Sequence, residues 1–214
     1  METQFDTILK NIQVVRPKKT TIESLDIGIK GGKIISLEHD INPEVGKSVI
    51  DGNNYLAFPG LVDAHMHTGI YTHLKEDAIT ESRAAAMGGV TTSINYMRTV
   101  QYYLNKSGPY REFFPEVLAI SDGKFHVDYA YHLAPMMGSH IDEIEYIIEE
   151  FGVTSFKIFM FYGSHGLHGK SDDQSNFLMI GPDDKYDIAH FEFIMRGIQK
   201  AMEKYHEKKD IISL

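Results

Sequence analysis

The sequence contains no cysteine in its 214 residues, and acidic residues outnumber basic ones. Without cysteine, a disulfide scaffold, a thiolate zinc site and a cysteine nucleophile are excluded, so a bound metal would need histidine, carboxylate or lysine ligands. The 21 Lys+Arg against 30 Asp+Glu give a formal net charge of -9. Because such a surface repels polyanions, we expect no nucleic-acid partner.

Long apolar runs are also missing. No stretch approaches the roughly 18 apolar residues of a membrane span, and the N-terminus has no basic segment followed by an apolar one. We therefore expect a soluble, cytoplasmic protein with no membrane partner. Hydrophobic residues make up 43% and charged residues 24%, which is typical of a globular chain and not of a disordered, collagen-like or coiled-coil one.

The first 57 residues predict a small β domain. Short β-like runs follow one another there, and two of them, residues 24–29 and 33–37, are separated by a segment that contains Gly31 and Gly32. Glycines at these positions supply the positive φ angles that a tight hairpin needs. We therefore interpret residues 1–57 as a β-sandwich-like domain.

From residue 58 onward, strand-like and helix-like stretches alternate. We expect strands near residues 60–64, 90–95, 126–133, 154–160 and 211–214, with helices near 79–87, 110–121, 141–151 and 188–206. This alternation predicts an α/β fold with a parallel sheet. A closed eightfold barrel needs about 250 residues, so we interpret residues 58–214 as a partial (β/α)8 TIM-type barrel with about five strands. The alternative is a complete open sheet whose final strand lies at the C-terminus.

Two histidines close the segment FPGLVDAHMH at residues 58–67. Residues two apart on a strand point to the same face, so His65 and His67 can share one divalent cation. The pair ends the first strand of the α/β region, and the carboxyl ends of strands are where such folds bind ligands. Asp63 lies on the same face. It either orients an imidazole from behind or makes a plain hydrogen bond near the strand start.

Lys157 interrupts the apolar strand SFKIFMFY at residues 155–162. A buried ammonium is costly, so this lysine must pair with an acid, extend its amine out of the strand end, or lose its proton. A neutral amine can take up carbon dioxide and become a carbamate, an anionic oxygen ligand that bridges two metals. Two interpretations of Lys157 therefore remain open: an ordinary lysine that is paired or solvent-exposed, and a carbamate that acts as a metal ligand.

These segments, together with RAAAMGGVTT at residues 83–92, resemble the amidohydrolase superfamily and within it the hydantoinase and dihydropyrimidinase group. The resemblance implies a (β/α)8 barrel with a β-sandwich side domain, and a hydrolase that opens cyclic amides at a non-peptide carbon–nitrogen bond. His65 and His67 would bind the first of two divalent metals, which the resemblance implies to be zinc, with manganese or cobalt as alternatives. Carboxylated Lys157 would bridge both metals, and Tyr162 would polarise the substrate carbonyl.

Relatives take further ligands from later strands: two histidines and an aspartate. We therefore expect a truncated chain that is inactive by itself, and the resemblance also implies a homo-oligomer, a tetramer in relatives. Two alternatives are a non-enzymatic scaffold related to dihydropyrimidinases and another cyclic amidohydrolase of allantoinase or dihydroorotase type. Dihydroorotases commonly carry an arginine where this sequence has Gly69, which favours a neutral ring as substrate.

The remaining histidines carry less weight. His190 lies in a segment that predicts the start of a helix, and His132 is expected to be a hydrogen-bonded interior residue. His165 and His168 are flanked by glycines, which is typical of a solvated loop.

Overall fold

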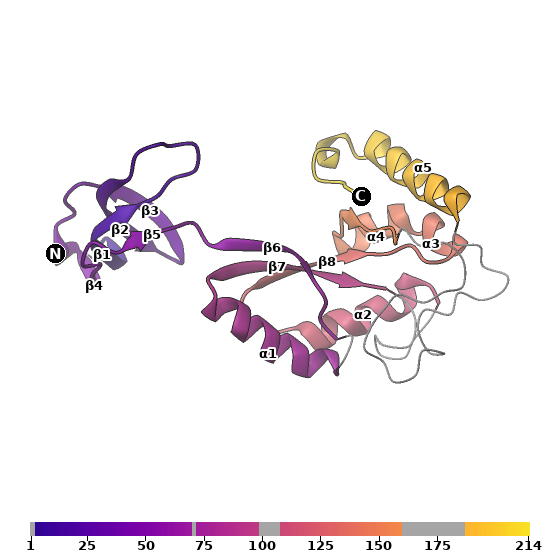
Figure 1. Cartoon of the computed structure of the whole chain (residues 1–214), viewed down its shortest axis with the longest axis horizontal. Coiled ribbons are helices and arrows are strands. Elements are labelled where there is room, and N and C mark those ends of the chain that lie inside the picture. The colour runs from indigo at the N-terminus through magenta and orange to yellow at the C-terminus, as the bar shows by residue number, and fades with distance from the viewer. Residues whose placement is uncertain (1–2, 70–71, 99–107, 160–186) are drawn as a thin grey trace. The chain divides into compact units, whose positions relative to one another are not determined.

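A computed structural model of the chain describes residues 3–69, 72–98, 108–159 and 187–214. The chain forms two compact units, residues 1–60 and residues 61–214 (Figure 1).

The first unit is built on a five-stranded sheet. Its elements are β1 (Phe5–Val14), β2 (Glu23–Lys30), β3 (Lys33–Glu38), the 3-10 helix η1 (Pro43–Val45), β4 (Gly46–Asp51) and β5 (Leu56–Ala57). The strand order is β3-β2-β1-β4, with β5 also paired to β1. β1 runs antiparallel to β2 and parallel to β4 and β5. The predicted hairpin is confirmed, since Gly31 and Gly32 join β2 to β3 with φ angles of 56° and 73°.

The second unit contains a curved parallel sheet. Its strands are β6 (Leu61–Met66), β7 (Val90–Met97), β8 (Asp128–Leu133) and β9 (Ser155–Phe156), which pair in that order. Every pairing is parallel. Beyond β9, an isolated parallel bridge joins Ser155 to Ser213. The predicted α/β fold with a partial barrel sheet is thereby confirmed.

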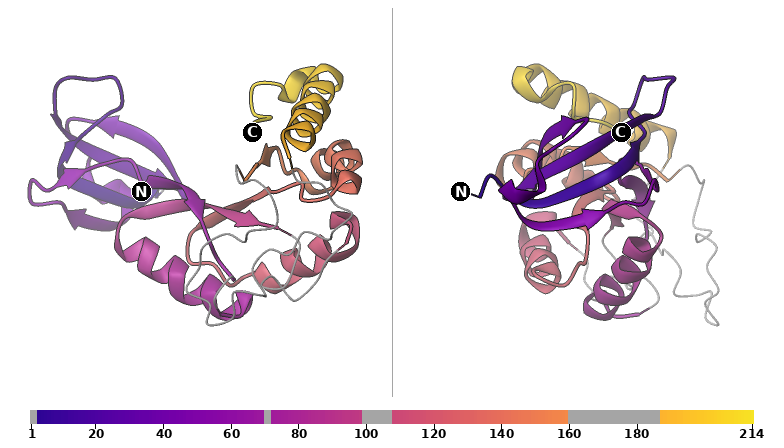
Figure 2. Two further views of the ribbon diagram at one scale, coloured as in Figure 1. Left: turned by 45° about the vertical axis from the view of Figure 1, so that its right-hand side comes forward. Right: turned by 90° about the vertical axis from the view of Figure 1, so that its left-hand side faces the viewer.

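Helices alternate with these strands. They are α1 (Leu74–Met87), α2 (Tyr110–Ser121), α3 (Gly138–Asp142), α4 (Ile144–Phe151), α5 (Ile188–Lys204) and the 3-10 helix η3 (His206–Lys208). Figure 2 shows α1 and α2 along one side of the curved sheet. Apolar side chains of α2 and α4 pack against β8 and form the main core, which includes Phe114, Tyr131 and Ile148. Among the described residues, no helix is long and apolar enough to cross a membrane.

Several predicted elements differ from the structure in their bounds, and the strand expected at residues 211–214 is wrong, because only the isolated bridge at Ser213 forms there. α1 begins at Leu74, five residues earlier than expected, and the Asp77 carboxylate in its first turn accepts a hydrogen bond of 2.8 Å from the Gly69 N–H. The expected helix over residues 141–151 is divided into α3 and α4 at Glu143. The regular ladder of β9 ends at Phe156, although the Lys157 N–H still donates to the Leu133 carbonyl at 2.9 Å.

Glu143 explains the division of that helix. Its buried carboxylate accepts hydrogen bonds from the Tyr110 N–H at 2.8 Å, the Arg111 N–H at 3.2 Å and the Arg111 Nε at 2.7 Å. These contacts tie the junction of α3 and α4 to the first turn of α2, a constraint that the local helical pattern does not contain.

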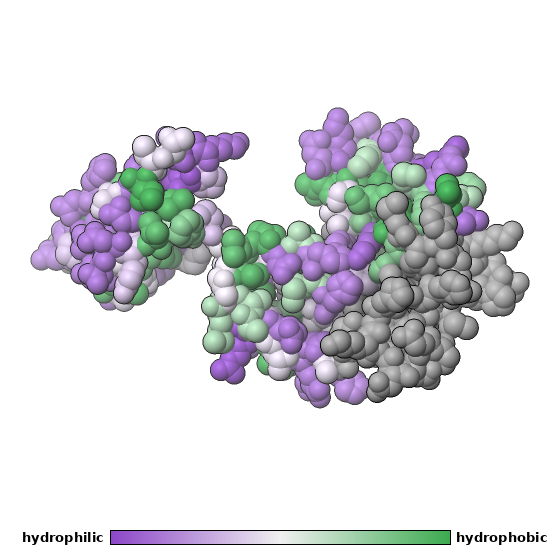
Figure 3. Space-filling view, viewed as in Figure 1, coloured by the Kyte–Doolittle hydropathy of each residue, from purple (hydrophilic) through white to green (hydrophobic). Residues whose placement is uncertain are grey.

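Apolar side chains are exposed on both units (Figure 3). The large ones include Ile34, Ile35 and Leu37 on β3, Leu61 and Val62 on β6, and Phe193 and Met195 on α5. In the described sheet, β6 pairs with β7 alone, so its other edge is open.

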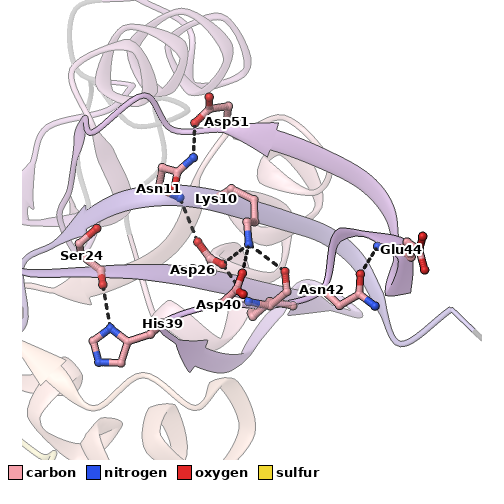
Figure 4. Close-up of polar contacts among 10 residues, drawn as sticks. Lys10, Asn11, Ser24, Asp26, His39, Asp40, Asn42, Glu44 and Asp51 are labelled. Atoms are coloured by element: carbon pink, nitrogen blue, oxygen red, sulfur yellow. Dashed lines mark hydrogen bonds and ion pairs between the residues drawn. The ribbon is translucent and has the colours of Figure 1, made fainter.

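A buried acid organises the polar contacts of the first unit (Figure 4). Asp26 is 2% exposed, and its carboxylate accepts hydrogen bonds from the Asn11 N–H at 3.0 Å and the Ile41 N–H at 2.9 Å. The Lys10 amine lies 2.7 Å from the same carboxylate and also contacts Asp40 at 2.8 Å. Burial by itself raises the pKa of Asp26, but Lys10 and the two backbone donors hold it below its usual value.

Candidate functional site

The structure brings the two predicted histidines together at the carboxyl end of β6. The Nε2 atoms of His65 and His67 lie 2.9 Å apart, and their ring centroids are separated by 4.9 Å. His65 is within β6 and His67 directly follows the strand. The one residue between them allows both rings to face the same side, as the spacing predicts.

Lys157 joins this pair from the opposite end of the described sheet. Its Nζ lies 2.7 Å from the His65 Nε2, although the two residues are 92 positions apart in the sequence. The amine also lies 4.4 Å from the ring centroid of Tyr96 and 4.6 Å from that of Phe159. In the described part of the chain, no carboxylate forms an ion pair with Lys157.

His132 on β8 lies beside the three predicted residues. Its ring centroid is 5.0 Å from that of His65, and its Nδ1 lies 3.3 Å from the Ser155 Oγ. Its Nε2 is buried and has no hydrogen-bond partner within the described part of the chain. The expected hydrogen bond is therefore present on one ring nitrogen, while the other nitrogen is unpaired next to the site.

The surroundings of these side chains keep the imidazoles neutral. Burial lowers the pKa of His67 to about 4, and the charge on Lys157 contributes next. Burial, followed by His65 and Lys157, lowers the pKa of His132 to about 4. Burial and then the charge on Lys157 also lower the pKa of His65. A neutral imidazole is the form that binds a metal ion.

The pKa of the Lys157 amine is also lowered. Burial lowers its pKa, and the positive charge of Arg98 contributes next. A lowered pKa increases the fraction of neutral amine, which is the nucleophilic form of a lysine.

Asp63 has a local partner. Its Oδ1 accepts a hydrogen bond of 3.0 Å from the backbone N–H of His65. This contact is the backbone hydrogen bond that the sequence gives as one interpretation of Asp63, and orientation of an imidazole by Asp63 stays a prediction. It fixes the chain just before the histidine pair.

Other predicted residues lie elsewhere. Tyr162, His165 and His168 are outside the described residues. His190 lies near the start of α5, where its N–H donates to the Asp187 cap at 3.1 Å and its Nε2 lies 2.8 Å from the Pro135 carbonyl. The predicted helix start is therefore confirmed.

Sequence reasoning gave no role to Tyr96, which forms one wall of the site. Its ring centroid is 5.0 Å from that of His67 and 6.1 Å from that of His65. The parallel register pairs Tyr96 with His132. Both lie near strand ends, and that position is the signal by which the sequence could have indicated them.

The donors at the site fit part of a metal centre. Two neutral imidazole nitrogens and one amine nitrogen converge, and histidine nitrogens are common ligands of divalent zinc. Within the described ranges, no group of three or more His, Asp or Glu side chains is arranged to hold an ion. Beside the donors, a hollow of about 550 Å³ is lined in part by His65, His132 and Lys157.

Comparisons with known proteins identify relatives of this chain. The chain is 34% identical over 160 residues to a D-hydantoinase of Geobacillus stearothermophilus, a match that covers 72% of this chain and 32% of that protein. It is 31% identical over 159 residues to an allantoinase of Escherichia coli strain K12 / DH10B, with 73% of this chain and 32% of that protein covered. No family model matches.

A solved structure of L-hydantoinase (dihydropyrimidinase) from Arthrobacter aurescens shares the fold. The TM-score is 0.68 at 23% identity, and the match covers 92% of this chain and 39% of that one. The curved parallel sheet is thus part of a TIM-type barrel that is accompanied by a separate β unit. The chain belongs to the hydantoinase group of the amidohydrolase superfamily. It spans about a third of the length of the curated relatives it matches.

Proposed function

We propose that this chain supplies part of the metal centre of a hydrolase that opens hydantoin-like or dihydropyrimidine-like rings. The observation that carries the proposal is the convergence of His65, His67 and Lys157 from the two ends of the described sheet. The sequence relatives named D-hydantoinase and allantoinase support a cyclic amide as substrate and a non-peptide carbon–nitrogen bond as the bond that breaks.

Lys157 is proposed to act as a carbamate. Its neutral amine attacks carbon dioxide, a nitrogen–carbon bond forms, and one N–H proton passes to solvent. The product carries one negative charge shared by two oxygens, which suits it to bridge two cations. The absence of an acidic partner in the described residues and the lowered pKa of Lys157 both favour this modification.

His65 and His67 are proposed to hold the first cation through their neutral imidazoles. Two divalent ions, zinc in the first instance with manganese or cobalt as alternatives, would supply a water molecule of lowered pKa for attack on the ring carbonyl. Tyr162 is proposed to donate its hydroxyl hydrogen to the carbonyl oxygen. Tyr96 and Phe159 would keep bulk water from the Lys157 nitrogen, because their rings cover it.

The match to allantoinases favours a second candidate, an allantoinase-type hydrolase with the same donors and a different ring. The relative affinities of the chain for hydantoin, dihydrouracil and allantoin separate the two candidates. A scaffold without metals is the non-enzymatic alternative, and it predicts no stoichiometric zinc. We further propose that the protein acts in the cytoplasm as a homo-oligomer.

Zinc binding tests the proposal directly. Equilibrium dialysis of the 214-residue chain should show zinc that is lost in His65→Ala and in His67→Ala. His206→Ala is the matched control, because this exposed histidine lies in η3. Zinc retained by both site variants, or no zinc on the wild-type chain, would contradict the proposed function.

A further inference from the structure

Arg98 is a buried cation with an unsatisfied donor. The residue is 4% exposed, and its Nη1 is buried without a hydrogen-bond partner among the residues that the structure describes. Arginine stays protonated in proteins, so deprotonation cannot relieve the cost of burying it. No carboxylate in the described ranges forms an ion pair with Arg98.

The other buried charged groups that the structure describes, Asp26 and Glu143, are paired. Asp26 contacts Lys10 at 2.7 Å, and Glu143 contacts Arg111 at 2.7 Å. Both carboxylates also accept backbone hydrogen bonds. Arg98 lacks such compensation, which indicates that its partner is an anion from outside the described residues.

Arg98 lies at the carboxyl end of the strand that neighbours the histidine strand. It follows directly after β7, the strand between the histidine strand β6 and β8. Tyr96, two residues earlier, packs against both His65 and His67. After burial and other nearby charges, the charge of Arg98 contributes to the lowered pKa of His67, and it is the second cause for Lys157.

We propose that Arg98 binds a carboxylate group on the substrate, so that the preferred cyclic amide carries a carboxylate substituent. This inference rests on the proposed function. The planar guanidinium donates two parallel hydrogen bonds to a carboxylate, a geometry that a lysine cannot reproduce. Gly69 favours a neutral ring because no arginine stands at that position, but Arg98 places an arginine directly after the neighbouring strand β7.

The carbamate of Lys157 is a second source of the same carboxylate chemistry. If Arg98 served that group, its loss would reduce carbamate formation and leave the choice of substrate unchanged. The two sources therefore predict different results for one set of variants.

The test compares two probes that differ in charge, hydantoin-5-acetate and hydantoin-5-acetamide. Their affinities for the zinc-loaded 214-residue chain are measured by ligand-observed NMR. We expect the acetate to bind about ten-fold more tightly than the amide, and Arg98→Gln to abolish this preference. Arg98→Lys should retain part of it, because the charge remains and the paired geometry is lost. Arg83→Gln, an exposed change on α1, is the control and should keep the full preference.

Three results would overturn the inference. One is equal affinity for both probes in the wild-type chain, and another is an undiminished preference in Arg98→Gln with a native circular dichroism spectrum. The third is that no binding of hydantoin-5-acetate is detected at millimolar concentration of this probe. A preference that Arg98→Lys retains in part supports it even if Arg98→Gln fails to fold.

Labelling with 13C-bicarbonate separates the carbamate source. Loss of the carbamate signal in Arg98→Gln, together with an unchanged acetate preference, assigns Arg98 to Lys157 and overturns the inference. Zinc dialysis keeps the proposed function separate. If zinc is lost in His65→Ala but no preference for hydantoin-5-acetate is found, the carboxylate inference fails and the hydrolase proposal stands. If the preference depends on Arg98 but no zinc binds, the hydrolase proposal fails and only the carboxylate site is supported.

Discussion

The Nζ of Lys157 lies 2.7 Å from the Nε2 of His65, and the two side chains come from strands at opposite ends of the described sheet. Two protonated groups would repel each other at this distance. The contact is therefore consistent with the lowered pKa values of both residues, for which burial is the first cause. It places the Lys157 amine next to an imidazole nitrogen that we propose as a metal ligand.

Replacement of Lys157 by arginine should remove the carbamate and keep the positive charge. We expect zinc affinity to fall at least about ten-fold, because a bridging anionic ligand is replaced by a cation. The measurement is zinc dialysis with 13C-bicarbonate NMR on the same samples. Lys200→Arg is the control, since this exposed lysine pairs with Glu145 on the helical side of the unit. An unchanged zinc affinity in Lys157→Arg would contradict a role as ligand.

Acid should destabilise the metal-free chain before its carboxylates titrate. The pKa values of His67 and His132 are lowered from 6.5 to about 4, so the unfolded state takes up protons that the folded state does not. The free energy of unfolding should therefore fall as the pH drops from about 6.5 toward 4. Urea unfolding at pH 7 and pH 5 in the presence of a chelator measures this difference.

His132→Gln should reduce that pH difference by about 1 kcal/mol, a value discounted for the partial exposure of the ring. His206→Gln serves as the control at an exposed position. Equal pH differences in wild type and His132→Gln would show that His132 does not contribute.

Removal of the buried charge of Glu143 should destabilise the second unit. Glu143→Gln keeps the shape of the side chain but weakens its contacts with Arg111 and with the first turn of α2. We expect a loss of about 2 kcal/mol by urea unfolding, because Arg111 is half exposed and loses less than a buried partner would. Glu192→Gln breaks an exposed pair with Arg196 and should change stability by less than about 0.5 kcal/mol. Equal effects of the two substitutions would refute a structural role for Glu143.

The open edge of β6 predicts self-association. Leu61 and Val62 are 60% and 61% exposed on this strand, and an unpaired apolar edge is a template for pairing with another chain. We expect the 214-residue chain to form concentration-dependent species in analytical ultracentrifugation, and Val62→Lys to reduce them. Thr80→Lys adds the same charge to the exposed surface of α1 and should leave them in place. A wild-type chain that is monomeric at all concentrations would exclude self-association through the open edge of β6.

Local patterns predicted the parts of the molecule that depend on neighbours in sequence. Gly31 and Gly32 indicated the hairpin, and the strand period placed His65 and His67 on one side. The division at Glu143 was not predictable in this way, because it depends on a contact with Arg111, which is 32 residues away. The positions of His132 and Arg98 depend on the register between strands, which no single segment encodes.

The order of the four strands in the second sheet has a consequence for synthesis on the ribosome. Because β6, β7, β8 and β9 are neighbours in the sheet in the order in which they are translated, each emerging strand can add to an edge that already exists. The sheet can thus grow by stepwise addition. The Lys157 amine, which contacts His65, follows the last of these strands, so the proposed cation site is assembled only after the supporting strands are in place.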